Sequence, residues 1–196
     1  PDTQFIKVNY KKIDLDFLNL SGCYFGSCYS FFLEQYNGKL IIAERNGNIN
    51  ITSFDSLDKD NPTFSNIQTH LDFDNLLDIY IYQNDIYVTG KKSIDKKVSL
   101  EILKGNFEGN KINFESIIKL RSKNCIRQYP HLAGKVQLFN EDKNKILLSL
   151  NQGGWADNPS LENLSPDSIC GKILLVDTKN KSYEIPNKLT ENKKIL

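Results

Sequence analysis

The fold is indicated first by the stretch Lys143-Asn-Lys-Ile-Leu-Leu-Ser-Leu150, in which a polar turn leads into a short apolar strand. The same pattern occurs twice upstream, as Asn37-Gly-Lys-Leu-Ile-Ile-Ala-Glu44 and Gln83-Asn-Asp-Ile-Tyr-Val-Thr-Gly90. Each copy is followed by a further strand candidate, at Asn48 to Phe54, Val98 to Lys104 and Gly171 to Val176. A unit that recurs in this way predicts a repeated antiparallel architecture.

The spacing of this repeat favours the blades of a β-propeller. Leu40 to Ile86 is 46 positions, within the roughly 40 to 50 residues of a four-stranded blade. Ile86 to Ile146 is 60 positions, and the excess is similar in length to the loop region Asn151 to Cys170. We therefore predict about three blades. Because any all-β domain has turn-strand units every ten residues or so, a complete β-sandwich remains the alternative.

The rest of the chain also predicts an all-β protein. Short runs of Ile, Val, Tyr, Phe and Leu are separated by clusters of Asn, Gly, Asp and Lys, and no apolar stripe of helical period is long enough for a helix. The pairs Asn37-Gly38, Asn46-Gly47 and Asn84-Asp85 predict tight hairpins, because these residue types tolerate positive φ. The predicted segments are 1–28 (first strand and lead-in), 29–70 (blade one), 71–125 (blade two) and 126–196 (blade three, with an inserted loop 151–170).

Three blades are fewer than the four to eight of known propellers, and they would leave sheet edges open. The chain also lacks methionine and begins at Pro1. We therefore expect it to be the N-terminal part of a longer protein, a six-bladed propeller, from which a leader or lipid anchor could have been removed. The early strand Phe5 to Leu15 is expected to pair with the last blade.

Charge and hydropathy exclude two classes of partner. The chain has 25 Lys plus Arg against 24 Asp plus Glu, and the lysines are spread among asparagines and aspartates. No global field therefore favours nucleic acid or an anionic membrane surface. No apolar run approaches the roughly 18 residues of a membrane-spanning helix.

Four cysteines allow two interpretations. They show neither the spacing of a zinc site nor a neighbouring histidine cluster. An oxidising compartment would permit disulfides, with a local Cys23–Cys28 bridge and a long-range Cys125–Cys170 bridge as one of three pairings. Buried free thiols are the other interpretation.

The polar segment Asp55 to Asn61 has oxygen ligands that calcium could use. It lacks the glycine and the terminal glutamate of an EF-hand loop. We therefore interpret it as an ordinary polar loop and predict no metal site in this chain.

Candidate catalytic residues lie where predicted strands begin and end. His131 comes just before the strand candidate around Val136, and Asn151 follows the strand that ends at Leu150. An imidazole in a pocket can accept a proton near neutral pH when a partner fixes its tautomer. Antiparallel neighbours would bring these two positions together, although a lone histidine is more often structural.

The long loop after Leu150 carries the only tryptophan. Loops of this length without regular structure are often functional. Trp155, with Gln152, could line a pocket by stacking on a sugar ring or a planar cofactor. Trp155 could equally anchor the loop against a blade.

Three segments together resemble the glucose/sorbosone dehydrogenase family, which includes the soluble pyrroloquinoline-quinone glucose dehydrogenases. Leu40-Ile-Ile-Ala-Glu-Arg-Asn-Gly-Asn-Ile49 looks like the first-blade signature of that family. His131-Leu-Ala-Gly-Lys-Val136 is similar to its His-x-x-Gly-Arg-Leu segment. The region from Ile146 to Gly154, followed by Gly171-Lys-Ile-Leu-Leu-Val-Asp177, resembles its later strand and Gly-Lys-Ile-Leu-Arg run. The order and spacing agree from about Leu40 to Asp177.

The resemblance implies a periplasmic or secreted six-bladed propeller that binds pyrroloquinoline quinone and calcium and oxidises a sugar or another alcohol. His131 would take the substrate hydroxyl proton, while hydride passes to the quinone. Most quinone and calcium contacts would lie in the remaining blades, beyond Leu196. The present chain alone would then bind no cofactor and be inactive.

Two departures from the family pattern bear on catalysis. Asn151 stands where the family has the aspartate that holds the histidine, and Lys135 stands where arginine is usual. Loss of that carboxylate removes the charge that stabilises an imidazolium. A propeller that has lost the chemistry and serves as a binding or scaffold module is therefore the alternative function.

Overall fold

The computed structural model describes residues 12–13, 31–95, 97–121, 134–139, 142–150 and 168–186. These residues form twelve strands and one helix of four residues, so the prediction of an all-β protein is confirmed. Within them, no helix is long and apolar enough to cross a membrane.

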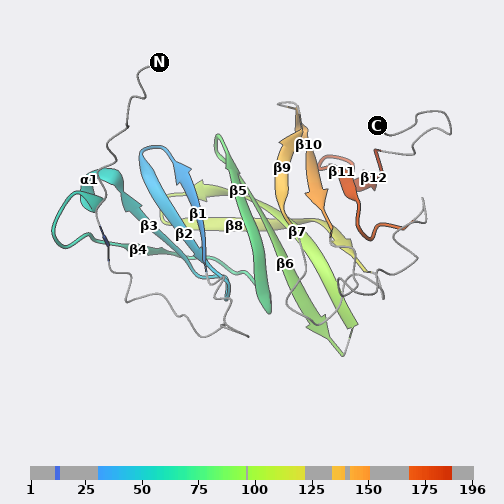
Figure 1. Ribbon diagram of the computed structural model, residues 1–196, viewed down its shortest axis with the longest axis horizontal. Helices are drawn as coiled ribbons and strands as arrows, with labels where there is room; N and C mark the ends of the chain where they lie inside the picture. The colour runs from blue at the N-terminus through green and yellow to red at the C-terminus, as the bar shows by residue number, and fades with distance from the viewer. Residues whose placement is uncertain are drawn as a thin grey trace, which may run out of the picture.

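The strands make three four-stranded antiparallel sheets, each built from consecutive strands (Figure 1). Sheet I contains β1 (Phe31–Tyr36), β2 (Lys39–Glu44), β3 (Ile49–Ser53) and β4 (Ser65–Ile67), with helix α1 (Phe54–Leu57) after β3. Sheet II contains β5 (Asn75–Tyr82), β6 (Asp85–Ile94), β7 (Lys97–Glu108) and β8 (Lys111–Leu120). Sheet III contains β9 (Val136–Phe139), β10 (Asp142–Ser149), β11 (Ile173–Asp177) and β12 (Ser182–Glu184).

The sequence repeat is also a structural repeat. The three turn-strand copies become β2, β6 and β10, each the second strand of its sheet, and the strand candidates that follow them become β3, β7 and β11. The interval from Ile86 to Ile146 is longer than that from Leu40 to Ile86, and we attributed the difference to the loop region 151–170. This interpretation was wrong, because 151–170 follows Ile146 in the chain. The extra length comes partly from β7 and β8, which have 12 and 10 residues against 5 and 3 in β3 and β4.

The hairpin turns follow from residues that accept positive φ. Asn37 and Gly38 have φ of 45° and 71° and join β1 to β2, so this predicted turn is confirmed. Gly47, with φ of 94°, lies in the predicted turn between β2 and β3. The predicted Asn84-Asp85 turn is shifted by one residue: Gln83 has φ of 55°, and Asp85 already belongs to β6.

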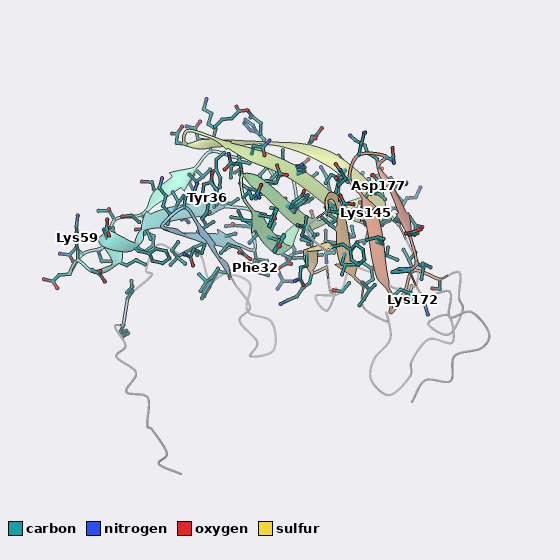
Figure 2. All side chains as sticks on the ribbon, turned by 90° about the horizontal axis from the view of Figure 1, so that it is seen from above. Phe32, Tyr36, Lys59, Lys145, Lys172 and Asp177 are labelled. Atoms are coloured by element: carbon teal, nitrogen blue, oxygen red, sulfur yellow. The ribbon has the colours of Figure 1, made fainter. Side chains whose placement is uncertain are left out.

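The sheets stack side by side, with sheet II in the middle (Figures 1 and 2). The first strands meet, because β1 contacts β5 and β5 contacts β9. Tyr36 of β1 stacks on Phe107 of β7 with ring centroids 4.4 Å apart, and its hydroxyl donates to Asn84 Oδ1 over 2.9 Å. Sheet II is therefore covered on both faces.

Two apolar cores follow from this stacking. One lies between sheets I and II and contains Ile41, Ala43, Ile49, Ile67, Leu76, Ile79, Ile86, Val88 and Ile112. The other lies between sheets II and III and is built mainly from Tyr87, Leu100, Ile102, Ile117, Leu120, Val136, Leu138, Ile146, Leu148, Leu174 and Val176. Alternate residues of β5 and β6 enter opposite cores, because side chains alternate across a strand.

The described residues close no ring, and the propeller, its blade count and the division into segments stay predictions. Of the early strand predicted at Phe5 to Leu15, only residues 12 and 13 are described, and neither is in a strand. Cys170 is buried and disulfide-bonded. Cys23, Cys28 and Cys125 lie outside the described residues, so the pairing also stays a prediction.

Candidate functional site

A pocket of about 360 Å³, which we call the inner-strand pocket, lies where the first strands of the three sheets meet. Its charged and polar lining comes from every sheet. Sheet I contributes Glu34 of β1, and sheet II contributes Asp78 and Tyr80 of β5. Sheet III contributes Gln137 of β9, Ser149 of β10 and Lys135, which directly precedes β9. Ile79, Val136, Leu147 and Ile173 complete the wall. Carboxylate acceptors, a lysine donor and an aromatic ring therefore surround one cavity.

Asp78 holds the lining together across two sheets. Its Oδ2 accepts a hydrogen bond of 2.9 Å from the backbone N–H of Val136, the first residue of β9. Thr89 of β6 donates from its hydroxyl to the carbonyl of Gly134. A β-carbon at Gly134 would lie 3.0 Å from Leu77 Cδ1, so glycine allows this close approach. The chain leading into β9 is thus fixed against sheet II.

The pKa values of the two carboxyl groups of the pocket are both raised. Burial raises the pKa of Glu34, the negative charge of Asp78 raises it further, and a backbone N–H bond from Gln35 lowers it. Burial also raises the pKa of Asp78, against the lowering effects of the Val136 N–H, the positive charge of Lys135 and the Ile79 N–H. The net direction is upward for both, as expected for like charges in a partly desolvated site.

These shifts predict how stability depends on pH. A carboxyl whose folded pKa exceeds its unfolded value stabilises the fold most below the unfolded pKa, near 4, and this contribution is lost as pH rises through the folded pKa. The free energy of unfolding should therefore fall over this range. We expect Glu34→Gln and Asp78→Asn each to reduce that fall, as measured by urea unfolding at a series of pH values.

The matched control for this pH series is Glu108→Gln, at a carboxylate whose hydrogen bond to Asn113 is exposed. It should leave the slope unchanged. The asparagine oxygen in Asp78→Asn can still accept from Val136, so the fold is retained. If the free energy of unfolding falls with pH in both pocket variants as steeply as in wild type, the raised pKa values of Glu34 and Asp78 are contradicted.

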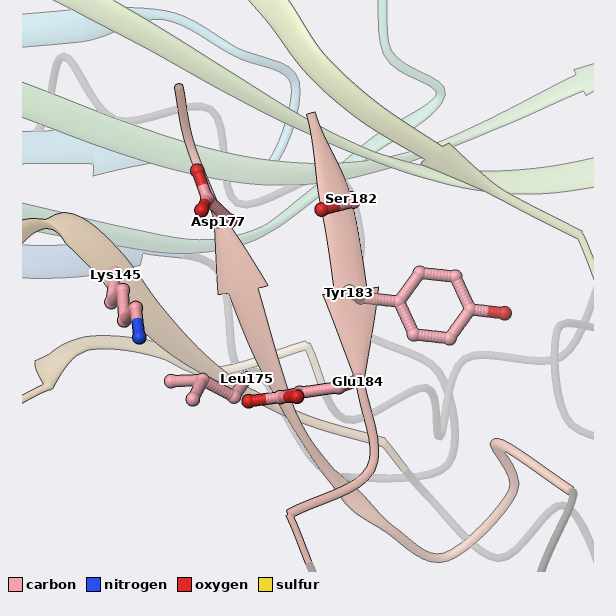
Figure 3. A pocket seen from close by; sticks show the side chains of 6 residues that line it. All are labelled: Lys145, Leu175, Asp177, Ser182, Tyr183 and Glu184. Carbon is pink, nitrogen blue, oxygen red and sulfur yellow. The ribbon is translucent and has the colours of Figure 1, made fainter. Parts of the chain in front are cut away.

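A second pocket, of about 230 Å³, lies on sheet III between β10, β11 and β12 (Figure 3). It is lined by Lys145, Leu175, Asp177, Ser182, Tyr183 and Glu184. Asp177 is occupied by the adjacent turn: it accepts from the N–H groups of Asn180 and Lys179 at 2.8 and 3.0 Å and from the Asn180 amide at 2.9 Å. These bonds, led by the Asn180 N–H, lower the pKa of Asp177. The Asp177 carboxylate of this pocket therefore serves mainly to stabilise the turn between β11 and β12.

The predicted catalytic and pocket residues His131, Asn151, Gln152 and Trp155 all lie outside the described residues. Their flanks are described. The N–H of Ser149 donates to the carbonyl of Lys135 over 2.9 Å, so the lead-in to β9 lies beside the end of β10. His131 is four residues before Lys135 and Asn151 two residues after Ser149 in the sequence. Both flanks line the inner-strand pocket.

The Glu-Arg signature between Leu40 and Ile49 has a structural role. Glu44 is 3% exposed and accepts from the side-chain amides of Asn50 and Asn46 at 3.2 and 3.3 Å. The carbonyl of Arg45 accepts from the N–H of Leu76 over 2.7 Å, which joins sheet I to sheet II. The described residues contain no group of three or more His, Cys, Asp or Glu that could hold a metal ion.

Sequence reasoning missed the two pocket carboxylates. Asp78 interrupts the apolar run Leu76-Leu-Asp-Ile79, and Glu34 directly follows the apolar run Phe31-Phe-Leu33, each in the first strand of a sheet. An acidic residue inside such a run or at its end is the available signal, because charges are rarely placed in half-buried strands without a partner or a role. Lys135 was noted only as a replacement for arginine.

No model of a known protein family matches the chain. No curated protein matches it either. The resemblance to the glucose/sorbosone dehydrogenases therefore rests on its three motifs alone.

Proposed function

We propose that the three sheets are blades of a β-propeller. Support comes from the consecutive strand order of each sheet and from the contacts among the first strands β1, β5 and β9. In a propeller, four-stranded sheets pack face to face around a central channel. The inner-strand pocket would then open on that channel.

We propose that this pocket binds a small hydroxylated molecule, a sugar or another alcohol. The observation that carries the proposal is the convergence of Glu34, Asp78 and Lys135 on one cavity of about 360 Å³. That volume lies within the roughly 300–1,000 Å³ of small-molecule sites. Carboxylates accept hydrogen bonds from hydroxyl groups, a lysine donates to them, and Tyr80 offers an apolar surface to a sugar ring.

Oxidation of that hydroxyl is the activity we propose for the full-length protein, with a quinone held by residues outside those described as the acceptor of the hydride. His131 would remove the hydroxyl proton, with Asn151 orienting its imidazole. The contact of Ser149 with Lys135 supports this pairing, because it draws the chain flanking each residue to one end of sheet III.

The quinone that the resemblance implies does not fit the described pocket. Pyrroloquinoline quinone carries several carboxylates, and Glu34 and Asp78 would repel them with only Lys135 in compensation. The described residues also lack a calcium-type cluster. Quinone and calcium thus remain proposals for the full-length protein, where residues outside those described would hold them.

A non-catalytic binding or scaffold propeller is the second candidate. Asn151, in place of a carboxylate, favours it, because an amide cannot stabilise an imidazolium by charge. For either function we propose a periplasmic or secreted location. The disulfide bond of Cys170 supports this, since disulfides persist in oxidising compartments.

The binding proposal is tested by calorimetry with a panel of sugars and alcohols. We expect at least one to bind wild type and to bind Asp78→Asn about tenfold more weakly, the effect of about one hydrogen bond to a charged group. Absence of binding across the panel would reject the proposed ligand class.

The oxidation proposal is tested by dye reduction, with quinone and calcium added to the full-length protein. We expect His131→Ala to lower the rate by about 10²–10⁴-fold, the range for a general base. The matched control is His70→Ala, at an exposed histidine between β4 and β5. Sugar binding without dye reduction would leave the binding module as the function.

A further inference from the structure

Glu34 enters the inner-strand pocket from sheet I. It lies on β1 between Phe32 and Tyr36, which both pack against the core between sheets I and II. Because side chains alternate across a strand, Glu34 is on the same face as these two rings and is turned toward sheet II. In Figure 1, β5 lies between β1 and β9, and it contacts both. The carboxyl group of Glu34 therefore faces the pocket rather than the outside of the sheet array.

The charge of Asp78, the other carboxylate of the pocket, is already compensated within the protein. Its Oδ2 accepts the 2.9 Å hydrogen bond from the backbone N–H of Val136. Burial raises the pKa of Asp78, but the Val136 N–H, the positive charge of Lys135 and the Ile79 N–H each lower it. Asp78 and Lys135 thus offset each other's charge in the pocket.

Glu34 has no comparable compensation from the described residues. Burial and the negative charge of Asp78 both raise the pKa of Glu34, and only the backbone N–H of its neighbour Gln35 lowers it. No described lysine or arginine forms a salt bridge with it. The described lining therefore has two carboxylates against one lysine, and Glu34 is the carboxylate left over.

We propose that Glu34 binds a protonated amino group of the ligand, so that the pocket takes an amino sugar or a related amino alcohol. This inference rests on the proposed binding of a hydroxylated molecule and narrows its chemical class. An ammonium group donates charge-assisted hydrogen bonds to a carboxylate, and these are stronger than bonds between neutral groups. A neutral sugar would displace water from Glu34 without supplying an opposite charge, which is unfavourable for a partly buried ion.

The other lining residues suit the rest of such a molecule. Lys135 can donate hydrogen bonds to hydroxyl groups, and Gln137 and Ser149 can both donate and accept them. Tyr80 offers an aromatic ring to the apolar face of a sugar. A sugar acid would instead place a further negative charge beside Glu34, so this lining disfavours it. The lining therefore selects a ligand that is both hydroxylated and cationic.

Calorimetry of the full-length protein at neutral pH, with matched pairs of compounds, tests the charge of the ligand. The pairs are glucosamine with glucose, galactosamine with galactose, and glucamine with sorbitol. In each pair an amino group replaces one hydroxyl group. We expect the amine of at least one pair to bind wild type about tenfold more tightly than its neutral partner, the effect of about one charge-assisted hydrogen bond.

Two pocket variants should change this preference in opposite directions. Glu34→Gln keeps the size of the side chain but removes its charge, so the two Kd values of the pair should come within about twofold of each other. Lys135→Gln removes the positive charge of the pocket and should increase the preference for the amine. Opposite changes cannot come from a shared loss of folding. The control is Glu108→Gln, at an exposed carboxylate of β7, which should keep the wild-type ratio of Kd values.

The outcomes separate this inference from the function on which it rests. The inference is overturned if the neutral partner binds at least as tightly as the amine in every pair that binds, or if Glu34→Gln keeps the wild-type ratio. Either result leaves the proposed binding of hydroxylated molecules in place. Absence of binding by all of these compounds would reject the proposed ligand class, and the inference with it.

Discussion

Tyr87→Ala is expected to lower the free energy of unfolding by about 3–5 kcal/mol, the range for truncating a buried aromatic side chain. Tyr87 is 0% exposed and is among the largest fully buried side chains of the described residues. It lies on β6 in the core between sheets II and III, in the place that Ile41 and Leu147 take in the other sheets. Its removal leaves a cavity that rigid sheets cannot close.

The variant Tyr87→Phe separates the contribution of the hydroxyl group to stability from that of the ring. Lys104 Nζ lies 5.6 Å from the ring centroid and 2.9 Å from Asp85 Oδ2, so the hydroxyl adjoins an ion pair. Burial raises the pKa of Tyr87, Lys104 lowers it and Asp85 raises it. We expect Tyr87→Phe to cost about 1 kcal/mol, the net value of one hydrogen bond.

Urea unfolding measures both Tyr87 variants. Tyr183→Ala is the control, because Tyr183 is 43% exposed on β12 and should change stability by no more than about 0.5 kcal/mol. A loss below about 1 kcal/mol in Tyr87→Ala would show that the two sheets do not share this core.

Gly90→Ala is expected to destabilise the protein by about 3 kcal/mol, at the upper end for overpacking. The ring of Phe73 lies directly against the backbone of Gly90, and a β-carbon there would overlap the ring. Phe73 packs into the core between sheets I and II from the connection that leads to β5. The added methyl group must therefore displace an aromatic ring from that core.

The double variant tests whether the ring causes the loss at Gly90. Phe73→Ala removes the overlapping ring, so Gly90→Ala should cost little in that background, and the two changes should cost less together than their sum. Additive losses, or a single Gly90→Ala variant within about 0.5 kcal/mol of wild type, would contradict the proposed contact.

The strands that form hairpins could be predicted from the sequence because their signals are local. Asn37-Gly38 marks a turn wherever it stands, and the apolar runs after it and after Gln83 and Lys143 identify β2, β6 and β10. β4, with only Ser65–Ile67, is too short to stand out, and β8 alternates apolar residues with charged ones that also suit a loop. Pairing with β3 and β7 makes both of them strands.

The candidate site depends on contacts that no local pattern encodes. Glu34 and Asp78 are 44 positions apart, and they line one pocket only because sheet I stacks on sheet II at its first strand. Lys135 joins them because Asp78 and Thr89 hold the chain on either side of it. The predicted site of His131, Asn151, Gln152 and Trp155 still awaits its test.

The sequence by itself determined that the chain is all-β, where most of its turns lie and that its units repeat, because turn propensity and strand alternation act over a few neighbouring residues. Only the tertiary structure decided which repeat faces are covered. Ile49, Ile102 and Ile173 each stand on the third strand of a sheet, opposite Ala43, Thr89 and Ser149 of the second strand. The first two isoleucines are buried, whereas Ile173 is 55% exposed. Burial depends on which sheet packs next, and that is a property of the stacked array rather than of any single strand.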